Sequence, residues 1–174
     1  MALKRLVFFW LASFIAATTG YYLLWLIPRY YVFGAPCGMP CYHYEHPVQY
    51  ILIPCFFYGI IATLYAERFY KQNKIRQIFS TLIIATLTVI ISSPFGGMLW
   101  HFHDMMAGYF PASSVDKMIR NGSKMGLSIG WLVIALSIPY NFLGLILCFF
   151  ITRKGAKLFR ADSSVVSSLN MTNN

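Results

Sequence analysis

The chain has 174 residues, of which 58% are hydrophobic and only 11% are charged, and its formal net charge is +9. A soluble domain usually carries about 25% charged and roughly 45–50% apolar residues. The composition therefore excludes an ordinary soluble domain and indicates an integral membrane protein.

Four apolar runs account for the excess of hydrophobic residues. They cover residues 6–27, 47–66, 78–100 and 125–152. Each reaches the roughly 20 residues that cross about 30 Å of hydrocarbon at about 1.5 Å per helical residue. Backbone polar groups in lipid must be paired within their own segment, so the runs are predicted to be helices. The sequence therefore predicts an all-α membrane protein, in which residues 1–152 form one bundle of four transmembrane helices.

The cationic residues are distributed unevenly between the two ends of these spans. On one side lie Lys4, Arg5, Arg68, Lys71, Lys74, Arg76, Arg153, Lys154, Lys157 and Arg160; on the other lie Arg29, Lys117, Arg120 and Lys124. By the positive-inside rule, the first group and both termini are predicted to be cytoplasmic. The basic charge then meets anionic headgroups of the lipid bilayer, so no nucleic-acid partner is predicted. We expect a multi-pass protein of a plasma membrane or a bacterial inner membrane.

The first of the two predicted extracytoplasmic loops, residues 28–46, contains the run PCGMPCYHYEHP. Cys37 and Cys41 are separated by a short turn with glycine and proline, and an oxidising compartment favours a disulfide between them. Such a bond either closes the loop structurally or takes part in thiol redox chemistry. The second loop holds no cysteine to accept electrons, which favours the structural role.

The second outer loop, residues 101–124, adds His101, His103 and Asp104 to the histidines of the first loop, His43 and His46. Imidazole is the commonest protein ligand for metals, so the four histidines form a candidate site for Cu, Zn or haem. If the third helix continues through this segment, Asp104 lies beside His101 and can orient its ring without binding the metal itself. The spacings match no strong zinc pattern, and histidines at a wet interface need no metal.

Small and polar residues in the spans suggest where helices meet. Gly126 and Gly130 form a pair of small residues that allows close packing of a neighbouring helix, and Asn141 is predicted to bond a freed carbonyl or another helix. Pro94 with Gly96 and Gly97 is expected to loosen the third span. In the second outer loop, Ser113 or Ser114 could cap a short amphipathic helix that ends at residues 121–122; an irregular loop is the alternative.

Residues 153–174 begin with cations and continue with a Ser- and Asn-rich stretch, which predicts a disordered cytoplasmic tail. Across the chain there is no Walker loop and no H-E-x-x-H motif, and no charged residue lies near the centre of a span. These features favour a non-enzymatic accessory, regulatory or exclusion protein whose outer loops bind a partner protein, a lipid or a metal. It is expected to work with another membrane protein or as a homo-oligomer. The alternatives are a metal- or haem-binding thiol oxidoreductase and a component of a transporter.

Overall fold

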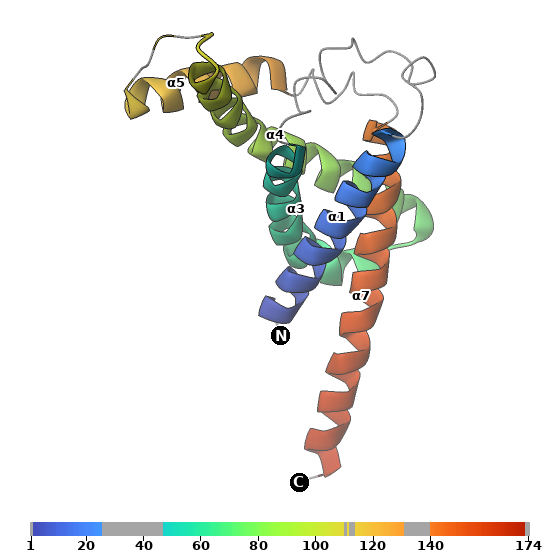
Figure 1. The fold of residues 1–174 in the computed structure, drawn as a ribbon. Coiled ribbons are helices and arrows are strands. Elements are labelled where there is room, and N and C mark those ends of the chain that lie inside the picture. Colours follow the sequence, from blue (N-terminus) through green and yellow to red (C-terminus); the bar gives the residue numbers. More distant parts are fainter. Residues whose placement is uncertain (1, 26–46, 110, 112–113, 131–139, 173–174) are drawn as a thin grey trace.

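A computed structural model describes residues 2–25, 47–109, 111, 114–130 and 140–172 of the chain. Within these residues the regular structure is entirely helical (Figure 1). The elements are α1 (Ala2–Trp25), α3 (Pro47–Tyr70), α4 (Lys74–Met106), α5 (Val115–Met125), the π-helical turn η1 (Gly126–Gly130) and α7 (Tyr140–Thr172). The marks for the two termini lie on one side of the molecule, and α5 lies on the opposite side.

Three of the described helices are long and apolar enough to cross a membrane. They contain the segments Leu3–Leu23, Val48–Tyr70 and Lys74–Met106. The fourth predicted span, residues 125–152, includes residues 131–139, which lie outside the described part of the chain. An all-helical, multi-pass architecture is therefore supported, while the count of four spans stays a prediction.

The surface of α4 is arranged as a lipid-exposed helix requires. Large aliphatic side chains face outward, and hydroxyl side chains are buried against other helices. The exposed group includes Leu82, Ile83, Leu87, Ile90 and Ile91, and the buried group includes Ser80, Thr81, Thr88, Ser92 and Ser93. Several of the buried hydroxyls donate to carbonyls of the preceding turn, for example Thr88 to Ile84 at 2.8 Å and Ser93 to Val89 at 2.7 Å. This pattern is favourable in lipid and unfavourable in water, since only lipid solvates the aliphatic face.

Neighbouring helices run antiparallel, as specific contacts near their ends show. Arg5 at the start of α1 forms a 2.7 Å ion pair with Glu67 near the end of α3. Tyr50 at the start of α3 lies 3.0 Å from His103 near the end of α4. The segment of α7 around residue 155 packs against the start of α1, because a Cβ built on Gly155 would collide with the ring of Phe9. The cations that the sequence assigns to the cytoplasm are thus gathered at one end of the described helices.

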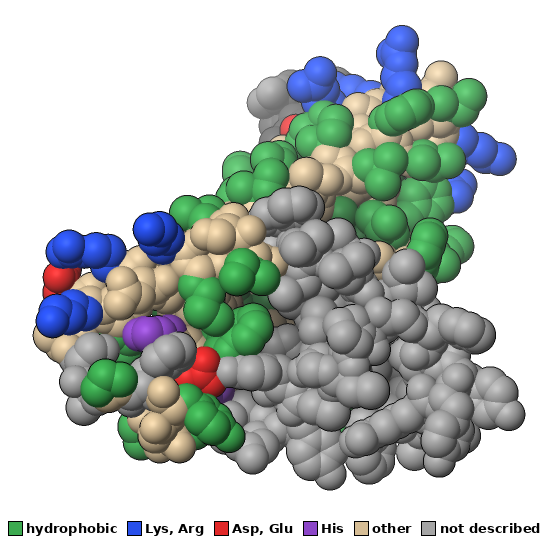
Figure 2. Space-filling view, turned by 90° about the horizontal axis from the view of Figure 1, so that it is seen from above, with side chains coloured by type: hydrophobic (Ala, Val, Ile, Leu, Met, Phe, Trp, Pro, Cys, Tyr) green, Lys and Arg blue, Asp and Glu red, His purple; other side chains and the backbone are tan. Residues whose placement is uncertain are grey.

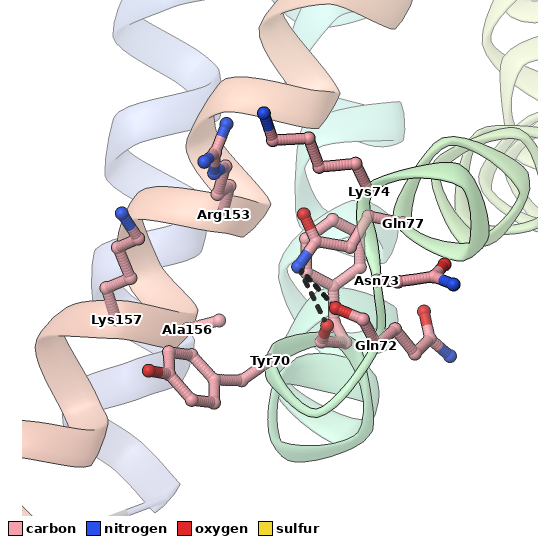
Figure 3. A pocket seen from close by; sticks show the side chains of 9 residues that line it. Tyr70, Gln72, Asn73, Lys74, Gln77, Arg153, Ala156 and Lys157 are labelled. Atoms are coloured by element: carbon pink, nitrogen blue, oxygen red, sulfur yellow. Dashed lines mark hydrogen bonds between the residues drawn. The ribbon is translucent and has the colours of Figure 1, made fainter.

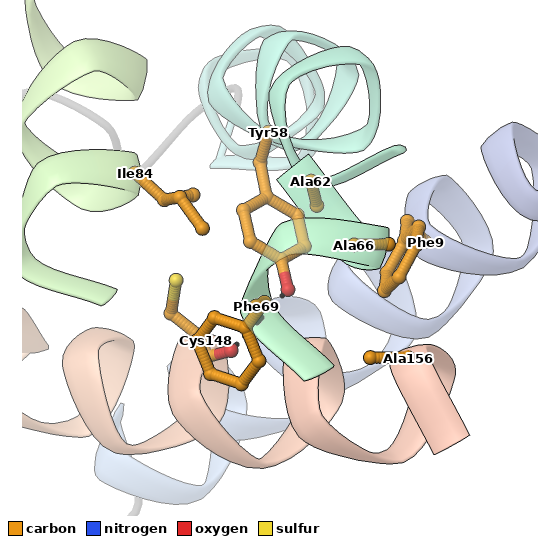
Figure 4. Close-up of a cluster of buried hydrophobic side chains, with 8 residues drawn as sticks. All are labelled: Phe9, Tyr58, Ala62, Ala66, Phe69, Ile84, Cys148 and Ala156. Atoms are coloured by element: carbon orange, nitrogen blue, oxygen red, sulfur yellow. Dashed lines mark hydrogen bonds between the residues drawn. The ribbon is translucent and has the colours of Figure 1, made fainter. Parts of the chain in front are cut away.

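The buried core lies where α1, α3 and α7 meet, with one residue from α4. Figure 4 shows its members: Phe9, Tyr58, Ala62, Ala66, Phe69, Ile84, Cys148 and Ala156. The hydroxyl of Tyr58 donates to the carbonyl of Cys148 at 3.3 Å and lies 2.9 Å from Thr152 Oγ1. A phenol buried among helices needs such partners, and here they join α3 to α7.

The helices extend beyond the segments that the sequence indicated. α4 continues through Pro94 and beyond residue 100 to Met106, so the segment is one helix of 33 residues. α5 does form, with Ser114 as its cap, but it passes through residues 121–122 instead of ending there. α7 is described as far as Thr172, while the disorder predicted for residues 153–174 stays a prediction. A helix that is already nucleated gains one hydrogen bond for each residue added, so α5 packed on α4 can continue even through residues of low propensity such as Asn121 and Gly122.

Candidate functional site

The end of α4 carries two of the four histidines that the sequence singled out, His101 and His103. They lie in different surroundings. His101 and Asp104, three residues apart on one helical face, are both buried with 8% of their surface exposed. The ring of His103 is only half-buried, with its Nδ1 3.0 Å from the hydroxyl of Tyr50 in α3. The two rings pack edge to face, with 5.6 Å between their centroids.

This geometry separates the two histidines of α4. Residues two apart on a helix point in different directions, and here His103 contacts α3. His101 shares its face with Ser93 and Gly97, which contact η1 and α5. In the described residues no three His, Cys, Asp or Glu side chains gather as metal ligands. His43, His46, Cys37 and Cys41 lie outside the described residues, so the four-histidine site and the disulfide both stay predictions.

We expect the substitutions His101→Ala and His103→Ala to act independently. His103 contacts Tyr50 of α3, whereas His101 lies on the helical face that packs toward α5 and η1, and substitutions with different neighbours couple weakly. The double variant, compared with both single variants by thermal unfolding in detergent, tests this directly. Strong coupling between the two positions, together with loss of bound Cu, Zn or haem, would instead support one common metal site.

A contact between glycines fixes α5 and η1 to the C-terminal half of α4. A Cβ built on Gly97 would overlap the carbonyl oxygen of Gly122 and lie 2.5 Å from the backbone nitrogen of Gly126. A Cβ on Gly126 would overlap the carbonyl oxygen of Ser93, and one on Gly122 would lie 2.6 Å from Met98 Cα. The backbones therefore approach more closely than any side chain permits. Of the predicted packing residues, Gly126 lies inside this contact and Gly130 lies at its edge, near Ser93.

Because its other side lies on α4, α5 presents a basic face outward. Ser114 Oγ accepts from the backbone N–H of Lys117, and Asp116 pairs with Arg120 at 2.8 Å. Lys117, Arg120 and Lys124 are exposed, next to the exposed apolar side chains of Val115 and Ile119. Figure 2 shows Lys and Arg side chains in two separate groups on one face of the molecule, with hydrophobic side chains between them.

Residues 126–130 read GLSIG and match the G-x-S-x-G pattern of nucleophile elbows. In that motif the serine sits on a sharp turn between a strand and a helix. Here the run is the π-helical turn η1, and the exposed Ser128 donates its hydroxyl proton to the carbonyl of Lys124. The structural context of a nucleophile elbow is therefore missing.

Other polar side chains in the predicted spans form hydrogen bonds within their own helix or are buried in the protein. Asn141, at the start of α7, accepts from the backbone N–H of Phe142 at 2.8 Å through its own Oδ1. Cys55 and Cys148 are buried as free thiols within helices. The hydroxyl of Ser13 donates to the carbonyl of Trp10 in the preceding turn of α1.

Comparison with protein families, with curated proteins and with solved structures finds no match for this chain. The class of protein is therefore defined by the helices themselves. The chain's described residues form an all-helical structure in which three helices are long and apolar enough to cross a membrane.

Proposed function

We propose that this chain is a multi-pass membrane accessory or regulatory protein that acts by binding another membrane protein at its outer end. Both termini lie in the cytoplasm, and α5 with the end of α4 lies on the extracytoplasmic side. The partner docks on the exposed face of α5.

The fixed position of α5 is the observation that carries this proposal. A connection between two spans needs only to be solvated, yet here it forms a capped helix held against α4 through glycine backbones. Such a contact holds the exposed side chains in a defined arrangement. A preorganised surface binds with less loss of conformational entropy than a mobile loop.

The chemistry of the exposed face defines the kind of partner. The exposed face of α5 carries three cations and one carboxylate. That carboxylate, Asp116, is already paired with Arg120. The partner segment that complements this surface is acidic, and it also has apolar side chains that can pack on Val115 and Ile119. A second copy that docked through the same face would set cation against cation, because a two-fold interface brings each patch against itself. Charge therefore favours a different membrane protein over a homodimer through α5.

Photo-cross-linking in the native membrane tests this proposal. A photoreactive residue at Ile119 of the full chain should give one cross-linked product of defined mass, and the variants Lys117→Glu and Arg120→Glu, combined in the same chain, should abolish it. The same residue at Leu82, which is 43% exposed on the predicted lipid face of α4, serves as the control and should give no such product.

Two outcomes would reject the proposed partner. A product of twice the mass of the chain would identify a second copy as the occupant of α5. Cross-linking from Ile119 to lipid alone would show that α5 rests on the membrane surface and binds no protein.

A further inference from the structure

A pocket opens at the opposite end of the molecule, between the α3–α4 turn and α7. It has a volume of about 400 Å³ and is lined by Phe69, Tyr70, Gln72, Asn73, Lys74, Gln77, Arg153, Ala156 and Lys157. Figure 3 shows Lys74 extending from the start of α4 toward Arg153 of α7, with Lys157 one turn further along the same helix. Segments almost 80 residues apart in the sequence, 74–77 and 153–157, thus form one site.

The charges in this pocket are unbalanced. It has three cations, Lys74, Arg153 and Lys157, and none of its lining residues is acidic. The nearby end of α3 carries Glu67, which is paired with Arg5 of α1. Neither of the two ion pairs found among the described side chains includes a cation of the pocket. Cations from two helices that converge without a carboxylate repel one another, and a bound anion removes this repulsion.

The neutral polar groups around the pocket are occupied in holding its shape. The side-chain amide of Gln77 donates to the carbonyls of Phe69 and Gln72, at 3.3 and 3.2 Å (Figure 3). Gln72 Oε1 accepts from Ser80 at 2.6 Å, and Asn73 Oδ1 caps α4 by accepting from the N–H of Arg76 at 3.0 Å. The buried Phe69 and Ala156 supply an apolar wall. The guanidinium of Arg153 lies over the ring of Phe149, 5.9 Å from its centroid, and Lys74 and Lys157 are exposed, so the three cations are the charged groups that a ligand would meet.

We propose that this pocket binds the phosphate group of an anionic ligand, and its position favours a phospholipid headgroup of the cytoplasmic leaflet. The pocket lies where the candidate spans in α3 and α4 end and begin, at Tyr70 and Lys74, which is the level of the headgroups. Basic pockets between helices on the cytoplasmic side suit such headgroups. Its volume falls within the range of roughly 300–1,000 Å³ that is typical of small-ligand sites.

The test compares two triple variants of the full chain that lose the same charge. The pocket variant carries Lys74→Gln, Arg153→Gln and Lys157→Gln. The control variant carries Lys4→Gln, Arg76→Gln and Lys154→Gln, three exposed cations at the same end that do not line the pocket. Native mass spectrometry from mild detergent measures adducts of phosphatidylglycerol, cardiolipin and phosphatidylcholine, and calorimetry with inorganic phosphate tests a soluble source.

We expect adducts of the two anionic lipids on the unmodified chain and on the control variant. The pocket variant should lose affinity for them by about a hundredfold or more, since each hydrogen bond from a cation to the phosphate contributes about tenfold or more and the control cations make no such contact. Saturable binding of inorganic phosphate that only the pocket variant loses would also support the site and would assign it to a soluble phosphate. Equal losses in both variants, or no loss in the pocket variant, would overturn the proposal, provided that both variants elute as the unmodified chain does in gel filtration.

Discussion

Gly97→Ala is expected to detach α5 and η1 from α4, whereas Gly96→Ala, one residue earlier, should leave the contact intact. The added methyl group at position 97 would meet backbone atoms of Gly122 and Gly126, which cannot rotate away as a side chain can. Overpacking usually costs about 1–3 kcal/mol and more where backbone must move, so we expect about 3 kcal/mol. At position 96 a Cβ has no neighbour within 4 Å, so alanine should stabilise α4 by up to about 1 kcal/mol.

Limited trypsin digestion measures this prediction at the affected helix. Lys117, Arg120 and Lys124 all lie in α5, and cleavage requires local opening of that helix. Faster cleavage in α5 and a lower thermal midpoint are expected for the Gly97 variant. If the variants at positions 96 and 97 were cut at equal rates, the glycine contact would not be what holds α5 in place.

Phe9→Ala is expected to open a cavity where α1, α3 and α7 meet. Phe9 is fully buried and packs edge to face on Tyr58, with 6.4 Å between ring centroids. Truncation of a buried phenylalanine typically costs about 3–5 kcal/mol. Lipid replaces water as the outer solvent here, so we expect a value near about 3 kcal/mol. Leu11→Ala, on the same helix but 45% exposed, should cost less than about 1 kcal/mol.

A compensating change on α7 makes this prediction specific. A Cβ on Gly155 would lie 2.5 Å from Phe9 Cζ, so Gly155→Ala alone should destabilise the protein. In the Phe9→Ala background the same methyl group enters the new cavity, and much of that destabilisation should disappear. Thermal unfolding of the four chains in detergent gives the coupling energy. Additive losses would show that α1 and α7 do not pack through this pair.

Hydropathy identified the three candidate spanning helices of the described residues but not their ends. The predicted span 78–100 lies inside α4, and 47–66 lies inside α3, which continues to Tyr70. A hydropathy window detects the part of a helix that matches the hydrocarbon layer. Helical hydrogen bonding continues into polar sequence, so α4, at 33 residues, is about 50 Å long and extends beyond a core of about 30 Å.

The roles of individual glycines could not be read from the sequence. Gly97 was expected to loosen α4 and Gly122 to end α5, yet both lie within continuous helices at the contact between them. Helix propensity treats glycine as a weak point. Close packing of two backbones also requires glycine, and only the arrangement of the helices distinguishes the two uses.

The sequence predicted more of the histidine-bearing end of α4 than of the basic pocket. Spacing predicted that Asp104 lies beside His101 if the third helix continued, but not that both are buried, because burial depends on elements distant in the sequence. The basic pocket was missed, because Lys74 and Arg153 meet only after α3, α4 and α7 have packed. The available signal was the clustering of cations in two segments assigned to the same side of the membrane.

Both proposals require that the basic pocket faces the cytoplasm and that α5 faces the opposite side of the membrane. Alkaline phosphatase, which is active only outside the cytoplasm, tests it when fused after residues 42, 72, 115 and 158 of the chain in a bacterial host. We expect activity for the fusions after residues 42 and 115, and none for those after residues 72 and 158. An active enzyme after residue 72 would place the α3–α4 turn outside and contradict both the topology and the proposed lipid site.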